Sequence, residues 1–154
     1  MTSIYDLPGH LIRRMHQISV SAFAAEVGGA GFDLTPVQFA ALSMLEEHPD
    51  VDQATLAGMI AYDRVTIGGV IARLESRGLI ERTVSETDRR ARRLRLTERG
   101  ASILQTVRPA VRRAQARMVA GLDAAEQDQL LALMHKIAEH NNEMSRAPLR
   151  PNET

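Results

Sequence analysis

Apolar residues recur along most of the chain at the three- to four-residue spacing of amphipathic helices, which bury one face and expose the other. The pattern predicts six helices, over residues 7–27, 36–47, 53–61, 64–77, 98–120 and 124–145. Gly28, Gly29 and Gly31 are expected to end the first of them, because glycine favours turns over helix interiors.

Polar residues of the type that cap helices stand where five of these helices begin. Before the second helix, Thr35 is the expected N-cap, followed by Pro36 at the first helical position and by Gln38, which would close a capping box. Asp52, Asp63 and Thr97 each come directly before a helical pattern and are typical N-caps. Asp123, followed three residues later by Glu126, is typical of a capping box at the start of the last helix. Periodicity and capping therefore predict the same helix starts.

The hydrophobic period changes after residue 77. Residues 79–84 have strand character and residues 93–97 alternate strictly, which predicts a β-hairpin with a long, charged tip. The two preceding helices are joined only by Tyr62 and Asp63, the short connection of a helix-turn-helix. The predicted fold is therefore mainly α with a small β-hairpin (α+β).

Composition excludes several classes of protein. The chain has 154 residues, of which 44% are hydrophobic, and 19 basic residues balance 19 acidic ones. It contains no cysteine, so disulfides, thiol nucleophiles and thiol redox switches are excluded. No apolar run approaches the roughly 18 residues that span a membrane, and the first ten residues do not resemble a signal peptide. These observations predict a soluble, cytoplasmic protein.

The balanced total conceals a polarised charge distribution. Residues 64–95 contain nine arginines and four acidic residues, a net charge of +5, whereas residues 32–63 contain six acidic residues and no basic one. Arginine forms bidentate hydrogen bonds with phosphates and with guanine edges. A basic hairpin is often only solvated surface, but directly after a helix-turn-helix it favours binding to double-stranded DNA.

The helix and the hairpin are expected to contribute different DNA contacts. The helix in the major groove is expected to use Arg64, Thr66, Gly68 and Arg73, and the hairpin Arg89, Arg90, Arg92 and Arg93. A glycine within a helix costs about 1 kcal/mol relative to alanine, so the pair at 68 and 69 requires a reason. Gly68 is expected on the exposed face, close to DNA, and Gly69 is expected to pack against the preceding helix.

At this point the chain resembles the MarR family of winged helix-turn-helix transcription regulators. The resemblance covers residues 7–145 and is most specific in four segments, residues 34–39, 53–57, 73–82 and 88–100. It implies that residues 1–34 and 98–146 form a helical dimerisation region, that residues 35–97 form the winged DNA-binding lobe, and that residues 147–154 form a flexible tail. It further implies that Arg90 enters the minor groove, with Asp88 positioned to orient it and Arg89 beside it.

The resemblance also implies a homodimer on a palindromic operator. The terminal helices have many apolar residues that a monomer of this size would leave exposed, and two-fold pairing would bury them. The half-sites of such a dimer lie about one turn of DNA apart.

Members of this family commonly repress transcription until a small molecule, often a phenolic or aromatic carboxylate, binds between the dimerisation helices and the DNA-binding lobe. The chain is accordingly expected to repress a catabolic, efflux or stress operon, with no cofactor and no thiol sensor. His10 and Arg14, with His16 nearby, border the apolar stripe of the first helix. Arg14 is a candidate to bind a carboxylate through two hydrogen bonds, although an arginine on a helix is more often solvated.

Other functions remain possible at this stage. The sequence contains no phosphate-binding loop and no G-x-S-x-G, and His135, Glu139 and His140 miss a zinc-hydrolase spacing by one residue, so no catalytic or metal-binding residues are predicted. Five scattered histidines permit a metal-responsive regulator of the same fold. A sequence-independent architectural DNA-binding protein is the third alternative.

Overall fold

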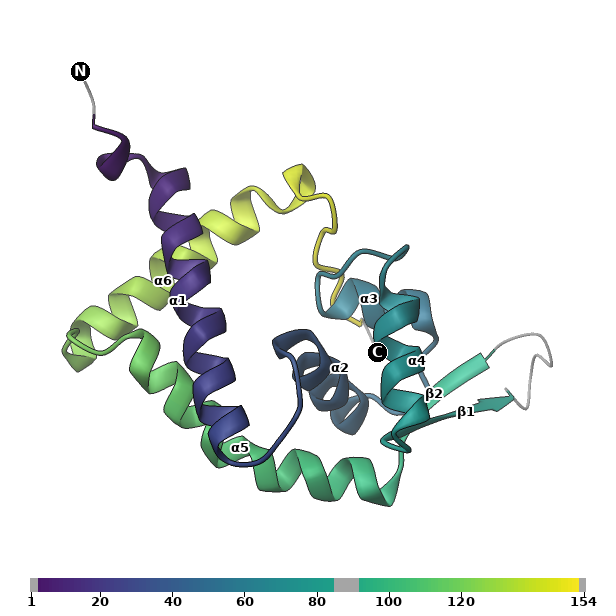
Figure 1. The fold of residues 1–154 in the computed structure, drawn as a ribbon. Coiled ribbons are helices and arrows are strands. Elements are labelled where there is room, and N and C mark those ends of the chain that lie inside the picture. The colour runs from purple at the N-terminus through teal and green to yellow at the C-terminus, as the bar shows by residue number, and fades with distance from the viewer. Residues whose placement is uncertain (1–2, 85–91, 153–154) are drawn as a thin grey trace. The chain divides into compact units, whose positions relative to one another are not determined.

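A computed structural model describes residues 3–84 and 92–152. Within them the elements are η1 (Ile4–Asp6), α1 (Pro8–Gly29), α2 (Pro36–Glu47), α3 (Gln53–Met59), α4 (Ile67–Ser76), β1 (Ile80–Val84), β2 (Arg92–Leu96), α5 (Glu98–Met118), α6 (Ala124–His140) and η2 (Asn142–Met144) (Figure 1). The predicted fold class, mainly α with a small antiparallel hairpin, is confirmed.

Several helices end away from the predicted positions, and the difference is largest for α6, which ends at His140 instead of residue 145. The ends of α1 and α3 show a physical reason. Gly28 and Gly29 lie within α1, and the helix ends only where Gly31 adopts a left-handed φ of 84°. There the Gly31 N–H donates to the Gly28 carbonyl (2.9 Å) and the Phe32 N–H to the Val27 carbonyl (3.1 Å), which is a Schellman motif. The prediction that Gly28 breaks the helix was therefore wrong.

The end of α3 has the same geometry without a glycine at the left-handed position. Ala61 has a φ of 50°, its N–H donates to the Gly58 carbonyl (3.2 Å), and the Tyr62 N–H donates to the Ala57 carbonyl (2.8 Å). The helix consequently ends at Met59 rather than at residue 61. An alanine in this conformation costs about 1 kcal/mol, so the tight turn is held by its surroundings.

The caps predicted at Asp52 and Asp123 form in the structure. The Asp52 carboxylate accepts a hydrogen bond from the Thr55 N–H (2.7 Å) at the start of α3. Asp123 and Glu126 form the reciprocal capping box of α6, with both N–H to carboxylate distances at 2.9 Å. The pKa of Asp52 is lowered, first by the Thr55 hydrogen bond, so its carboxylate is charged at neutral pH.

The chain forms two compact units. The first consists of Met1–Pro36 and Val107–Gln129, and the second of Val37–Thr106 and Leu130–Thr154. In the first unit the buried apolar residues come from α1, α5 and the segment between α1 and α2: Ala22, Phe23, Val27, Leu34, Val107, Ala110, Val111 and Ala114. Glu26 of α1 binds Arg113 (2.9 Å) and Arg117 (3.0 Å) of α5, and these hydrogen bonds lower the pKa of Glu26.

The second unit is built around leucine and isoleucine side chains of α2, α3, α4, α5 and the hairpin. The fully buried ones are Leu42, Leu45, Leu56, Ile67, Ile71, Leu74, Leu79, Ile80, Leu94 and Leu104. The strands pair antiparallel, with Ile80 opposite Leu96 and Val84 opposite Arg92. Leu94 also pairs with Val51, which adds one residue from the α2–α3 connection to the sheet.

The exit from the hairpin is bonded directly to the end of α4. The Thr97 hydroxyl donates to the Gly78 carbonyl (2.7 Å) and accepts from the Gly100 N–H (3.0 Å), while the Thr97 N–H donates to the Leu79 carbonyl (3.2 Å). This geometry brings the first turn of α5 so close to Leu79 that a Cβ on Gly100 would overlap the Leu79 carbonyl.

We therefore expect Gly100→Ala to lower the free energy of unfolding by about 1–3 kcal/mol, because the backbone itself must move. Urea denaturation followed by circular dichroism measures this change. Gly9→Ala is the matched control, since nothing lies within 4 Å of the position that a Cβ would occupy there. Equal stability of the two variants would contradict the close approach at Gly100.

Candidate functional site

Helix α4 has one buried apolar face and one solvent-exposed face. Ile67, Val70, Ile71 and Leu74 are buried against the second unit, in which α4 contacts α3 and β1 (Figure 1). The exposed positions are Gly69, Ala72, Arg73 and Ser76. Small and polar side chains on an otherwise firmly anchored helix leave its backbone accessible to a large partner such as the major groove of DNA.

Asp63 organises the chain that leads into α4. Its carboxylate accepts from the Val65 N–H (2.7 Å), and its carbonyl accepts from the N–H groups of Thr66 (3.2 Å) and Ile67 (3.0 Å). The Val65 hydrogen bond lowers the pKa of Asp63 most, and the charge of Arg146 lowers it further. The prediction that Asp63 is the N-cap of this helix was therefore wrong: α4 begins at Ile67 with Thr66 as its N-cap, and Asp63 instead holds the turn that precedes it.

Three of the residues predicted to contact DNA from the helix are exposed. Arg64 and Thr66 are exposed in the turn before α4, and Arg73 is exposed two turns further along. Val65, between the first two, is also 88% exposed. These side chains therefore share the exposed edge of the helix-turn-helix.

Gly68 and Gly69 have the opposite environments to those predicted, since the sequence indicated an exposed Gly68 and a Gly69 packed against the preceding helix. Gly68 is half-buried, and a Cβ there would lie 3.3 Å from the Gln53 side-chain amide of α3. Gly69 is exposed, and a Cβ added to it would have no neighbour within 4 Å. Gly69 rather than Gly68 is therefore the glycine through which backbone could approach DNA closely.

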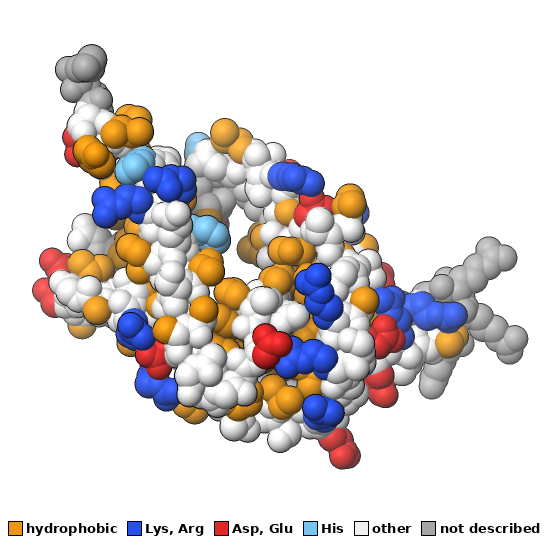
Figure 2. Space-filling model, in the orientation of Figure 1, with side chains coloured by type: hydrophobic (Ala, Val, Ile, Leu, Met, Phe, Trp, Pro, Cys, Tyr) orange, Lys and Arg blue, Asp and Glu red, His pale blue; other side chains and the backbone are white. Residues whose placement is uncertain are grey.

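The hairpin presents basic residues up to the point where the described residues end (Figure 2). Arg92 is exposed and Arg93 is half-buried on β2, whereas Asp88, Arg89 and Arg90 lie outside the described residues. The hairpin is tied to the helix-turn-helix by a bidentate hydrogen bond from Arg95 to the Asp50 carboxylate (2.9 and 2.7 Å). That ion pair lowers the pKa of Asp50.

The Arg82 guanidinium of β1 forms a second tie, to Glu75 of α4 (3.0 Å). This ion pair links β1 directly to α4, which it also contacts.

Sequence reasoning missed the two C-terminal arginines beside Arg64, which are Arg146 and Arg150. Arg146, from the C-terminal segment, binds the Asp63 carboxylate at 2.6 Å. No local pattern indicates this contact, because the two residues are far apart in the sequence.

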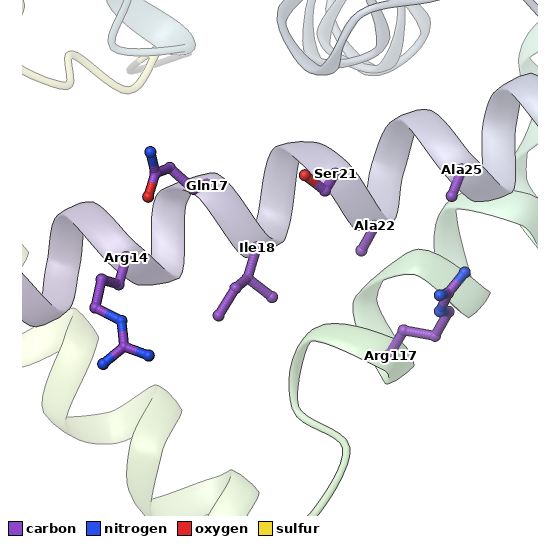
Figure 3. A pocket seen from close by; sticks show the side chains of 7 residues that line it. All are labelled: Arg14, Gln17, Ile18, Ser21, Ala22, Ala25 and Arg117. Carbon is purple, nitrogen blue, oxygen red and sulfur yellow. The ribbon is translucent and has the colours of Figure 1, made fainter.

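A separate cavity of about 540 Å³ lies in the first unit. Its lining combines two arginines with small and apolar side chains: Arg14, Gln17, Ile18, Ser21, Ala22 and Ala25 of α1, and Arg117 of α5. Arg14 lies near one end of this row and Arg117 near the other, beside Ala25 (Figure 3). Such a site offers cationic groups next to an apolar wall.

Of the three predicted ligand contacts, only Arg14 lines this cavity. His10 instead packs edge-to-face on Tyr5, with ring centroids 5.7 Å apart, and His16 is exposed.

Within residues 3–84 and 92–152, no three histidine or acidic side chains are grouped to hold a metal ion. In the same part of the chain, no helix is both long and apolar enough for a membrane span.

Comparison with known proteins places these features in a family. A sequence profile described as the MarR family matches residues 34–91, which include α2, α3, α4 and β1. The HTH-type transcriptional repressor NicR of Pseudomonas putida is 33% identical over 129 residues, which cover 84% of this chain and 80% of NicR.

Two solved structures extend the similarity over nearly the whole chain. Bordetella bronchiseptica BpsR, whose DNA binding is regulated by 6-hydroxynicotinic acid, has a TM-score of 0.84 and 27% identity, covering 90% of this chain and 98% of its own. The transcriptional repressor CouR, bound to a 23-mer DNA duplex, has a TM-score of 0.81 and 30% identity, covering 88% of this chain and 94% of its own.

The exposed glycine of α4 allows a direct test of this surface. We expect Gly69→Ala to raise the free energy of unfolding by up to about 1 kcal/mol, because alanine favours the helix and meets no neighbour. The same methyl group should weaken DNA binding about tenfold, by holding the backbone away from the base edges. Gly28→Ala, also without a neighbour, is the control for fluorescence-anisotropy titrations. Unchanged DNA affinity in Gly69→Ala would remove Gly69 from the interface.

Proposed function

Because this chain belongs to the MarR family, we propose that it is a dimeric transcriptional repressor that releases its operator when an aromatic carboxylate binds. The family and the relatives described above are transcriptional regulators, which are not enzymes. The single observation that supports DNA binding best is α4, whose buried apolar face leaves its glycine-, alanine- and arginine-bearing face exposed beside a basic hairpin. Such a regulator acts on chromosomal DNA, in the cytoplasm.

In this proposal the two basic elements bind different parts of the duplex. Helix α4 enters the major groove, where Arg64, Thr66 and Arg73 reach base edges and adjacent phosphates. The hairpin lies over the backbone with Arg92 and Arg93, and Arg90 at its tip enters the narrow minor groove, where the negative potential attracts arginine. CouR, which is similar to this chain in fold, was solved bound to a DNA duplex, which supports DNA binding by this fold.

The apolar surfaces of the terminal helices support a dimer. In α1, the exposed apolar residues include Leu11, Ile12, Ile18 and Val20. Helix α6 contains no buried residue, and Leu131, Leu133, Met134 and Ile137 are all exposed. A second copy that covers these side chains would remove apolar surface from water and would present two copies of α4 to a palindromic operator.

The cavity of the first unit supports an aromatic acid as the effector. The guanidinium of Arg14 provides a forked donor for a carboxylate, while Ile18, Ala22 and Ala25 provide apolar surface for a ring. The regulation of BpsR by 6-hydroxynicotinic acid favours the same chemical class. The operon controlled by this chain would then encode enzymes that degrade such an acid.

We expect the protein to bind its operator, selected from random-sequence DNA by repeated rounds of binding, at least about 10³-fold more tightly than unrelated DNA. Both affinities are measured at the same salt concentration, because phosphate contacts make them salt-dependent. A ratio near one would identify a sequence-independent architectural protein and would contradict the proposed function.

We expect 6-hydroxynicotinate or a related benzoate to raise the melting temperature in proportion to the logarithm of its concentration, since ligand binding stabilises the folded state by mass action. Arg14→Ala should abolish this shift, whereas Arg13→Ala removes the same charge from the neighbouring position outside the cavity and should retain it. A shift that persists in Arg14→Ala, or is absent with every aromatic acid, would contradict the proposed effector site.

A further inference from the structure

Residues 142–150 form a closed loop, which we call the C-terminal clasp. The Asn142 side chain donates to the Leu149 carbonyl (3.1 Å) and accepts from the Leu149 N–H (2.8 Å). The Arg150 guanidinium donates to both oxygens of Glu143, at 2.6 and 2.8 Å. These bonds join the two ends of the segment, so its conformation is defined by its own side chains.

The clasp contacts the helix-turn-helix at both ends of its turn. The Arg150 N–H donates to the Gly58 carbonyl (2.8 Å), the same carbonyl that closes the turn by accepting from the Ala61 N–H. A Cβ on Gly58 would lie 3.0 Å from the Arg150 Cβ, so a glycine at position 58 permits this close approach. At the other end of the turn, Arg146 binds Asp63, which holds the turn before α4.

Between the clasp and the turn lies a crevice of about 250 Å³ lined by three arginines. Arg64, Arg146 and Arg150 surround it, together with Asp63 and Tyr62. Arg150 is engaged with Glu143, and Asp63 is neutralised by Arg146. The side chain of Arg146 nevertheless remains 84% exposed, and a guanidinium has five N–H donors, so donors remain for a second acceptor.

The position of the crevice indicates which kind of ligand would accept hydrogen bonds from these arginines. Arg64 belongs to the surface that we assign to DNA, and Arg146 is bonded to the residue directly before it. A backbone phosphate is an anion that two guanidinium groups bind well, and the phosphates flank any helix that lies in the major groove. The pairing of Arg146 with Asp63 also removes a negative charge that would repel such a phosphate.

We propose that Arg146 and Arg64 together bind one phosphate of the operator backbone, so that the C-terminal clasp is part of the DNA-binding surface. This inference rests on the proposed function, because it requires an operator. It assigns to the C-terminal segment a function beyond closing its own loop, and it adds a basic residue to the interface defined by α4 and the hairpin.

The salt dependence of operator binding tests the inference. Each phosphate contact contributes about 0.9 to the slope of the logarithm of affinity against the logarithm of salt concentration. Arg64→Ala/Arg146→Ala removes both groups and should therefore reduce the magnitude of this slope by about 0.9 and weaken binding about eightfold at 0.1 M salt, with the difference vanishing near 1 M. Arg146→Ala leaves Arg64 at the phosphate and should change the slope and the affinity in the same direction by a smaller amount. Arg146→Lys keeps the charge and should keep the slope.

Arg112→Ala, which removes an exposed arginine of α5 in the first unit, is the matched control and should leave the slope unchanged. An equal loss of affinity at all salt concentrations in Arg146→Ala would show that Arg146 only supports the turn, and would overturn the phosphate contact. An unchanged affinity and slope would overturn it as well. If the wild-type protein shows no preference for a selected operator, the proposed function itself fails, which is a distinguishable result.

Discussion

The arrangement of the second unit depends on the burial of one face of α4. Ile67, Ile71 and Leu74 are completely buried, and helix–helix and helix–strand packing at this density permits few orientations of α4. Because the apolar side chains hold the helix, its other face needs no stabilising contacts, and its exposed side chains are small except for Arg73. The hairpin is held by the same core through Leu79, Ile80 and Leu94. One apolar cluster thus orients both elements of the proposed DNA-binding surface.

The acidic residues before α4 are compatible with this basic surface because they are used within the fold. Asp50 binds Arg95, Asp52 caps α3, and Asp63 holds the turn before α4 and binds Arg146. The folded-state pKa of each carboxyl is lowered. Their stabilisation is therefore present at neutral pH and is lost as the pH falls from the unfolded-state pKa through the folded-state pKa. These carboxylates consequently stabilise local structure, and the charges of Asp50 and Asp63 are partly neutralised by Arg95 and Arg146.

Local patterns in the sequence were sufficient to predict the elements and their caps, but not contacts between distant segments. Periodicity predicted the six α-helices of the described residues and the hairpin, though not the short 3-10 helices η1 and η2, and short-range signals predicted the caps at Asp52 and Asp123. The roles of Gly68 and Gly69 were exchanged because one position along a helix rotates a residue by about 100°, and the rotation was uncertain before the packing was known. The pairing of Val51 with Leu94 and of Asp63 with Arg146 had no sequence signal, because each joins segments separated by several elements. The candidate cavity was predicted only at Arg14, since Arg117 comes from a helix distant in the sequence.

At the end of α3, backbone conformation alone would favour glycine at position 61 and alanine at position 58, but the chain has the opposite arrangement. Ala61 has the left-handed φ that suits glycine, whereas Gly58 has an ordinary helical conformation and is small because Arg150 lies against it. Protein engineers who redesign α4 for a new operator thus have a stabilising change available outside the interface. Glycine or asparagine at position 61 would relieve backbone strain and compensate for destabilising choices in α4, whereas position 58 is best left invariant in any library.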